Sequence, residues 1–152
     1  MAALPPLDRT DQVFIAGRWQ ASASLATLAL TDPSDGRELC NIARGNGADI
    51  DAAVAAAMAA LDGPWGQLTA AERGRCLLAL SARVLANVDA LARLEAQDVG
   101  KPLTQARNGA LALARYLEFY GGAADKVMGE TIPYAAGSTV LTLREPHGVT
   151  GH

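Results

Sequence analysis

Residues 69–102 read TAAERGRCLLALSARVLANVDALARLEAQDVGKP, and this stretch decides the expected fold. It opens with Thr69 and Glu72 at the spacing of a capping box, which predicts the start of a helix. Residues 87–89 (NVD) are expected to break that helix and to restart a shorter one. Gly100 and Pro102 supply a C-cap and a stop, so the stretch predicts two consecutive helices. Its apolar periodicity predicts one buried face made of Leu77, Leu80, Val84, Val88 and Leu91.

Further helices are expected on both sides of this stretch. Upstream, Asn46 is a predicted N-cap, and the dipeptide Gly63-Pro64 is a predicted stop. The apolar stripe between them consists of Ile50, Val54, Ala57, Met58 and Leu61. Downstream, a long helix is predicted from about residue 103 to residue 127, with an interruption or end near Gly121-Gly122. Its face is expected at Leu103, Ala106, Ala110, Leu113, Leu117 and Tyr120.

Strands are expected at the two ends of the chain. Residues 13–20 predict a short hairpin that turns at Ala16-Gly17. Residues 28–31 and 38–43 predict two strands, which flank the dense turn signal DPSDG at residues 32–36. The alternating segment STVLTLR at residues 138–144 predicts a strand, and residues 148–151 resemble the opening of another. The chain is therefore expected to be mostly helical, with a short N-terminal hairpin and a C-terminal strand.

Composition excludes several classes of protein. The net charge is −3 with no basic stripe, so we expect no nucleic-acid partner. The longest apolar run, residues 52–61, is too short to cross a bilayer, and residues 1–12 lack the apolar core of a signal peptide. Cys40 and Cys76 have neither CxxC spacing nor a nearby histidine, which predicts ordinary thiols in a reducing compartment. We therefore expect a soluble, cytoplasmic protein that does not bind membranes.

A set of short motifs, each weak alone, occurs in a fixed order from residue 14 to residue 149, and together they resemble the N-terminal part of NAD(P)-dependent aldehyde dehydrogenases. The motifs are FIAGRW (14–19), DPSDGRE (32–38), DIDAAVAAA (49–57), PW (64–65), ERGR (72–75), LARLE (91–95), DVGKP (98–102), residues 116–121, GET (129–131) and REPHGV (144–149). The turn has Asp32 where this family usually has asparagine.

The resemblance implies an α/β fold and the oxidation of an aldehyde to a carboxylic acid with NAD or NADP. In the family a cysteine forms a thiohemiacetal, a glutamate activates water and an asparagine stabilises the oxyanion. None of these three catalytic residues maps onto this chain, and no residue of it maps onto a cofactor contact. The family's P-W-N motif is expected just beyond His152, so we expect an N-terminal fragment that is inactive alone and binds no NAD(P).

The resemblance also implies a division of the chain. Residues 1–11 are expected to form a flexible arm, and residues 12–137 the N-terminal helical part of the fold. Residues 138–146 are expected to be a strand of the bridging element that forms the homo-oligomer of the full-length enzyme. Residues 147–152 would be the start of the nucleotide-binding domain.

One site is expected to be partly present. Several members of the family hold a structural monovalent cation, K⁺ or Na⁺, and by position its ligands here would be Leu30, Thr31 and Asp98. Two backbone carbonyls and a carboxylate suit a hard cation. The alternative is that Asp98 is simply a carboxylate at a helix end.

The dehydrogenase fragment is the first of three hypotheses. The second is a non-catalytic helical module, or a pseudogene product, that mediates subunit contact through the strand at residues 138–144. A third hypothesis, new chemistry at Cys76, has less support: Arg73, Arg75 and a helix N-terminus favour a thiolate there, but the sequence supplies no base and no oxyanion hole. We also predict marginal stability, because the helices lack the domain that they would normally pack against.

Overall fold

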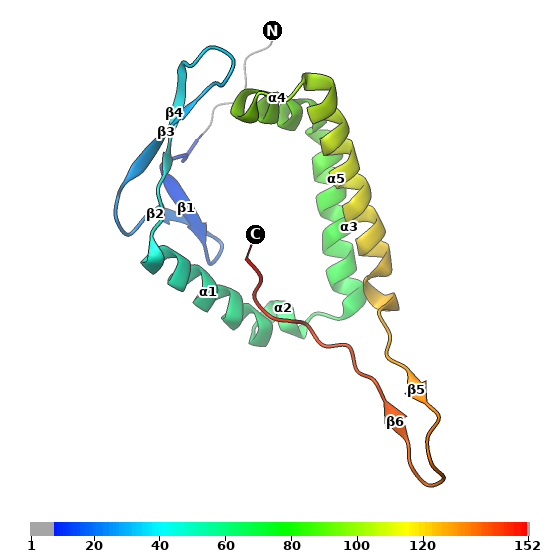
Figure 1. Cartoon of the computed structure of the whole chain (residues 1–152). Helices are drawn as coiled ribbons and strands as arrows, with labels where there is room; N and C mark the ends of the chain where they lie inside the picture. Colours follow the sequence, from blue (N-terminus) through cyan, green and yellow to red (C-terminus); the bar gives the residue numbers. More distant parts are fainter. Residues whose placement is uncertain (1–7, 152) are drawn as a thin grey trace.

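The computed structural model describes residues 8–151, whose elements are arranged in a ring (Figure 1). Helices α3 (Ala70–Ala86) and α5 (Leu103–Ala123) run side by side along one side. The strands within residues 12–43 and helix α1 (Gly47–Asp62) form the other side, and α4 (Val88–Val99) lies between the two sides at one end. This arrangement confirms a mostly helical chain with short pairs of strands.

The N-terminal hairpin forms as predicted. Strand β1 (Gln12–Ile15) pairs antiparallel with β2 (Arg18–Ala21), and Phe14 lies opposite Trp19. The two-residue turn has positive φ angles of 53° at Ala16 and 75° at Gly17, as a type I′ turn requires. The rings of Phe14 and Trp19 meet edge to face with their centroids 5.1 Å apart, so the aromatic pair holds the two strands together.

The second pair of strands also matches the prediction. Strand β3 (Thr27–Thr31) pairs antiparallel with β4 (Glu38–Ala43), with a register shift at Leu30/Thr31. The turn between them closes through Gly36, whose φ is 75° and whose amide donates to the Asp32 carbonyl at 2.8 Å. The expected arm at residues 1–11 lies mainly outside the described residues. Within the described part, the Ala43 amide donates to the Thr10 carbonyl at 2.8 Å.

Helix α1 begins at the predicted cap and ends at the predicted stop. The Asn46 side chain accepts from the amides of Ala48 and Asp49, and Gly63 follows the last helical residue. Pro64 then starts a short helix, α2 (Pro64–Gln67), which is not predicted by the sequence pattern. A proline suits the first position of a helix because its missing N–H has no intrahelical partner there.

The packing of α3 against α5 corrects two predicted faces. The buried residues of these helices are small, apart from Val84, and follow one another at intervals of one or two helical turns: Gly74, Ser81, Val84, Ala106, Ala110, Ala114 and Gly121. Leu80, Leu103, Leu113 and Tyr120 were expected on the packed faces and are exposed instead. The helices approach so closely that a Cβ atom on Gly74 would lie 2.4 Å from the Gly121 carbonyl oxygen. Large side chains do not fit at such a crossing, so they point to its flanks.

The C-terminal part is less regular than expected. After the short 3₁₀ helix η1 (Ala124–Lys126), strand β5 (Thr131–Ile132) pairs with β6 (Val140–Leu141) in a hairpin that projects from the body (Figure 1). The predicted strand at residues 138–144 is therefore short, and its partner β5 was not predicted. Residues 148–151 form no strand, because Gly148 has a φ of 97° and no neighbouring strand pairs with this segment among the described residues.

Candidate functional site

The predicted cation ligands come from two elements whose ends meet. Leu30 and Thr31 end strand β3, and Asp98 lies in the last turn of α4. A Cβ atom on Gly100 would lie only 3.1 Å from Cγ of Pro33, so the turn after β3 packs directly against the end of α4. The fold thus brings the turn that follows Leu30 and Thr31 close to the end of α4, although Asp98 follows Thr31 by 67 residues in the sequence.

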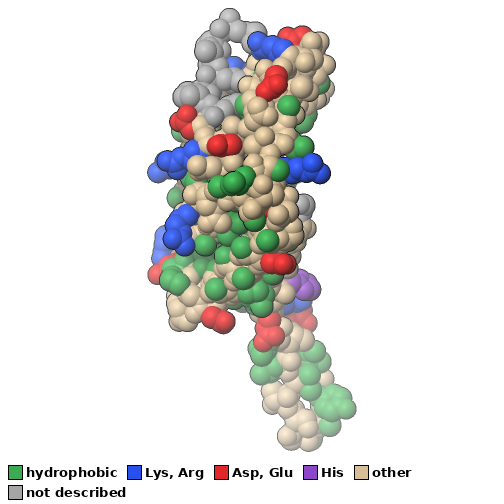
Figure 2. Space-filling model, turned by 90° about the vertical axis from the view of Figure 1, so that its left-hand side faces the viewer, with side chains coloured by type: hydrophobic (Ala, Val, Ile, Leu, Met, Phe, Trp, Pro, Cys, Tyr) green, Lys and Arg blue, Asp and Glu red, His purple; other side chains and the backbone are tan. Residues whose placement is uncertain are grey.

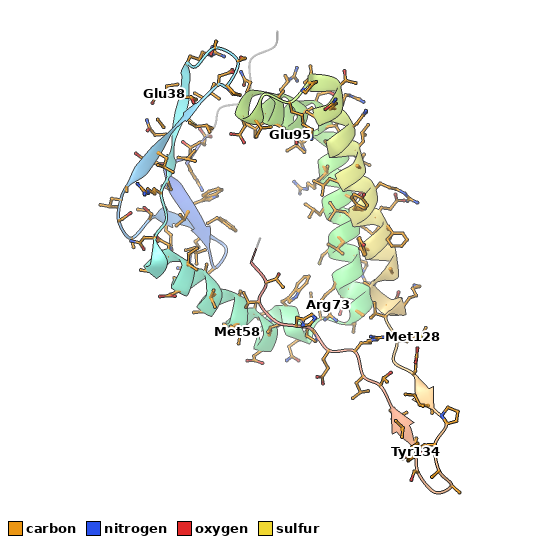
Figure 3. The ribbon with its side chains drawn as sticks, in the orientation of Figure 1. Glu38, Met58, Arg73, Glu95, Met128 and Tyr134 are labelled. Carbon is orange, nitrogen blue, oxygen red and sulfur yellow. The ribbon has the colours of Figure 1, made fainter. Side chains whose placement is uncertain are left out.

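The end of α4 has the electrostatic character that a cation site requires. The free carbonyls at the C-terminus of a helix make it negative. The last turn of α4 adds the carboxylate of Asp98 and contains no basic residue to offset it. Lys101 lies nearby, but its ammonium group is 2.7 Å from a carboxylate oxygen of Glu95, which Figure 3 labels on α4. The exposed Asp98 carboxylate and the nearby carbonyls are hard oxygen donors, so the donor set fits a monovalent cation.

The β3–β4 turn is held by Asp32. Its buried carboxylate accepts hydrogen bonds from the hydroxyl and from the backbone amide of Ser34. These two bonds, with the hydroxyl contributing most, hold the pKa of Asp32 below its usual value of 3.8, and Arg37 at 3.8 Å adds a weaker attraction. The ionised Asp32 therefore stabilises the turn that packs against the end of α4.

The N-terminus of α1 is occupied by the chain's own carboxylate. Asp49 is buried, and its two oxygens accept the amide of Ala23, in the loop before β3, and the amide of Asn46, both at 2.9 Å. Gly45 and Gly47 flank this cap, and the free amides of a helix N-terminus can in principle hold an anion. The carboxylate of Asp49 already fills the position at which an anion would bind, so the segment serves as a cap.

The two cysteines lie on different elements. Cys40 is half-buried in β4, and Cys76 is exposed on α3. Arg75, beside Cys76, is 3.9 Å from Glu72, which offsets its charge. His147 is exposed, and within residues 8–151 no three His, Cys, Asp or Glu side chains gather as metal ligands. Nor does any helix in this part of the chain have the length and apolar character needed to cross a bilayer.

The chain leaves much apolar surface uncovered. Its accessible surface is 11,196 Å², whereas a compact protein of 15.7 kDa would expose about 7,300 Å². Among the described residues no large side chain is fully buried, and each long helix has exposed large apolar side chains. Figure 2 shows such side chains gathered over the lower half of one face, where α1 lies. The described residues thus form a framework with large unfilled packing surfaces.

Comparisons with known proteins agree with the motifs. Residues 19–152 match the model of the aldehyde dehydrogenase family. A hydroxyisobutyraldehyde dehydrogenase of Mycolicibacterium austroafricanum is 40% identical over 151 residues, which are 99% of this chain and 29% of that protein.

Solved structures give the same result. A Burkholderia cenocepacia protein assigned to the aldehyde dehydrogenases is 61% identical, with a TM-score of 0.86 over 89% of this chain and 28% of its own. PnpE, solved in complex with nicotinamide adenine dinucleotide, is 38% identical, with a TM-score of 0.79 over 84% of this chain and 26% of its own. The chain therefore spans between a quarter and a third of the length of these relatives.

Proposed function

The chain belongs to the aldehyde dehydrogenase family, and from that premise we propose that it is the N-terminal framework of an enzyme that oxidises an aldehyde to a carboxylic acid. The observation that carries the proposal is the match of nearly the whole chain to less than a third of each relative. The uncovered apolar surface supports it, because such faces are expected where the remaining part of a larger fold would pack.

We propose that the chemical steps belong to residues outside this chain. The family's catalytic cysteine, glutamate and asparagine have no counterpart here, and the exposed Cys76 lies near no group that would act as its base among the hydrogen bonds of the described residues. NAD or NADP would accept the hydride when bound. This chain has no glycine-rich phosphate loop that would hold either cofactor, so we derive no cofactor contact from its residues.

We propose that the end of α4 contributes to a site for K⁺ or Na⁺. The carbonyls of Leu30 and Thr31 and the carboxylate of Asp98 would be its ligands, and the contact of Gly100 with Pro33 supports their approach. In this role the cation would neutralise the negative end of the helix and join it to the β3–β4 pair.

Two finer aspects of the function are also proposals. We propose that the full-length enzyme is a cytoplasmic homo-oligomer and that the β5–β6 hairpin contributes to the subunit contact. The hairpin projects from the body and exposes Tyr134, which lies between its two strands (Figure 3). Leu141 on β6 and Leu143 shortly after it are exposed as well. The same observation favours the second candidate function, a non-catalytic module that mediates subunit contact through this hairpin.

One pair of proteins tests the proposed function. The first is the purified chain, and the second is this chain fused to the remaining part of the Burkholderia cenocepacia relative. Production of NADH or NADPH is followed by absorbance with simple aliphatic and aromatic aldehydes. We expect the fusion protein to be active and the purified chain to be inactive. A folded but inactive fusion would contradict the proposal for this chain, and activity of the chain by itself would contradict the proposed location of the catalytic residues.

A further inference from the structure

We propose that Asn46 and Gly47 form a site of spontaneous backbone modification, at which the asparagine loses ammonia and becomes aspartate or isoaspartate, and that the capping box of α1 controls its rate. The proposal is independent of the proposed function, because the reaction needs only water. The amino-acid sequence contains two Asn-Gly pairs, at residues 46–47 and 108–109. The fold treats them differently, because Asn46 is the N-cap of α1 and Asn108 lies inside α5.

The reaction is an internal substitution at the side-chain amide. The backbone nitrogen of Gly47 attacks Cγ of Asn46, so that a new C–N bond closes an imide ring. The bond from Cγ to Nδ2 breaks, and the side-chain nitrogen leaves as ammonia with the proton that Gly47 gives up. Water then opens the ring at one of its two carbonyl carbons, which gives aspartate or isoaspartate. Glycine favours the attack, because no Cβ atom screens its nitrogen.

The attacking nitrogen of Gly47 is available at the start of α1. Gly47 is the first residue of the helix, where an amide has no acceptor within the helix. The hydrogen bonds of residues 8–151 include none from this nitrogen. Gly47 is also exposed, and a Cβ atom built on it would meet nothing within 4 Å. No neighbouring group therefore blocks the approach of this nitrogen to the side chain before it.

The capping box holds the side chain that is attacked. Oδ1 of Asn46 accepts the amide of Ala48 at 2.9 Å and the amide of Asp49 at 3.4 Å. The Asn46 amide in turn donates to the Asp49 carboxylate at 2.9 Å. Ring closure needs a rotation about ψ of Asn46, which is −172°, to bring the Gly47 nitrogen to Cγ, and these bonds resist it. The cap must therefore open before the ring closes, which makes the capping box the control on the rate.

Asn108 is as accessible as Asn46 but lies in a backbone that cannot rotate. Both side chains are exposed, so exposure does not distinguish the two pairs. The nitrogen of Gly109 takes part in the hydrogen-bond ladder of α5, and α5 packs along α3. Rotation at Asn108 would break that ladder inside a packed helix, whereas the first turn of a helix opens at little cost. The chain thus contains its own matched control for the same dipeptide.

The two products have different effects on α1. Aspartate keeps an oxygen that can accept the amides of Ala48 and Asp49, and it caps a helix as well as asparagine does. In isoaspartate the main chain runs through Cβ, which lengthens the backbone and takes the side-chain acceptor away from the cap. Asp49 also binds the amide of Ala23 in the loop before β3. The isoaspartate product therefore loosens the junction between α1 and the strands, and the aspartate product preserves it.

Peptide mapping of the aged chain tests the proposal. The purified chain is incubated in mildly alkaline buffer, digested with pepsin at acid pH, where ring closure is slow, and analysed by mass spectrometry. In the folded chain we expect position 46 to convert at least about tenfold faster than position 108, and in urea we expect similar rates at both. Gly47→Ala should lower the rate at position 46 severalfold with unchanged helix content, because its Cβ atom has open space. Gly109→Ala is the matched control and should leave the rate at position 46 unchanged.

A second pair of variants tests the control by the capping box. Asp49→Ala removes the acceptor of the Asn46 amide and should raise the rate at position 46 severalfold relative to position 108. Asp51→Ala removes a carboxylate from the same helix but outside the capping box, so it controls for the loss of charge. We expect this variant to keep the ratio of the two rates close to that of the unaltered chain.

Each part of the proposal has an outcome that would overturn it. Conversion at position 108 as fast as at position 46 in the folded chain, or no conversion at position 46 while the chain in urea converts, would overturn the site. Equal ratios in Asp49→Ala and Asp51→Ala would overturn the control by the capping box. Fragmentation by electron transfer distinguishes isoaspartate from aspartate, and the isoaspartate form should melt at a lower temperature than the Asn46→Asp variant. Equal melting temperatures would contradict the effect assigned to isoaspartate.

Discussion

Replacing Gly74 with alanine should push α3 and α5 apart. The added Cβ atom would lie 2.4 Å from the carbonyl oxygen of Gly121, which belongs to the backbone of the facing helix. Neither atom is at the end of a flexible side chain, so the clash is relieved only if the helices separate by about 1 Å to restore ordinary contact. Separation loosens the packing at Ser81 and Ala114 farther along the same interface.

Two opposing effects set the size of the change. Overpacking of a well-packed interface costs about 1–3 kcal/mol, and the clash with backbone places Gly74→Ala toward the upper part of that range. Alanine gains about 1 kcal/mol over glycine in the interior of a helix. The net destabilisation should therefore be about 1–2 kcal/mol, which corresponds to a decrease of about 2–8 °C in the melting temperature of a chain this size.

Gly122→Ala is the matched control for this experiment. Gly122 also lies in a helix of the same interface, but a Cβ atom there would meet nothing within 4 Å. This variant should keep most of the propensity gain, up to about 1 kcal/mol. Thermal and urea unfolding are followed by circular dichroism at 222 nm, the α-helix band. If Gly74→Ala were as stable as Gly122→Ala, the close approach of the two helices would be refuted.

Three further substitutions test individual contacts. Ser81→Ala removes the hydrogen bond of 2.7 Å to the Ala114 carbonyl and should cost about 1 kcal/mol in urea unfolding, and no loss would count against this bond. Asp49→Ala leaves the Ala23 amide without its acceptor and should cost about 1–3 kcal/mol, a loss that Asp49→Asn should partly restore. Because the pKa of Asp32 is lowered from 3.8, its stabilisation is complete above that pH and is lost as the pH falls through the lower folded value. Asp32→Asn should therefore make thermal stability less dependent on pH below about 4, and an unchanged acid profile would contradict this role.

The sequence predicted those elements whose signals are local. The Thr69 and Glu72 pair marked the start of α3, and Gly100 with Pro102 marked the end of α4. Asn46 was correctly predicted as the cap of α1. These signals depend on bonds within a few residues of one another, so they need no knowledge of the tertiary structure.

The packed faces were harder to predict, because large apolar side chains at a helical period were interpreted as the buried positions. Leu80 and Leu113 fit a helical period, yet the buried positions beside them are Ser81 and Ala114. Glycine, alanine and serine carry little hydrophobic signal, but they are what a close helix crossing requires. The same applies to the candidate cation site, where the approach of the β3 and α4 ends depends on a contact at Gly100 that no local pattern reveals.

Strand β5 and helix α2 were missed for a different reason. Strand β5 has only two residues, too few to show an alternation, and α2 has four. Pro64 was interpreted as the stop of one helix and is also the first residue of the next. A proline serves both purposes because it lacks the amide that a preceding turn would use.

Gly100 has a consequence for suppressor genetics. Its φ of 71° is a backbone conformation that most residues with a side chain avoid. A Cβ atom at this position would also lie only 3.1 Å from Cγ of Pro33, so there is little space for one. A loss-of-function allele at Gly100 should therefore not be rescued by Pro33→Ala, which clears the space but leaves the backbone strain. Revertants should restore glycine itself, so position 100 should tolerate very little variation in a saturation library.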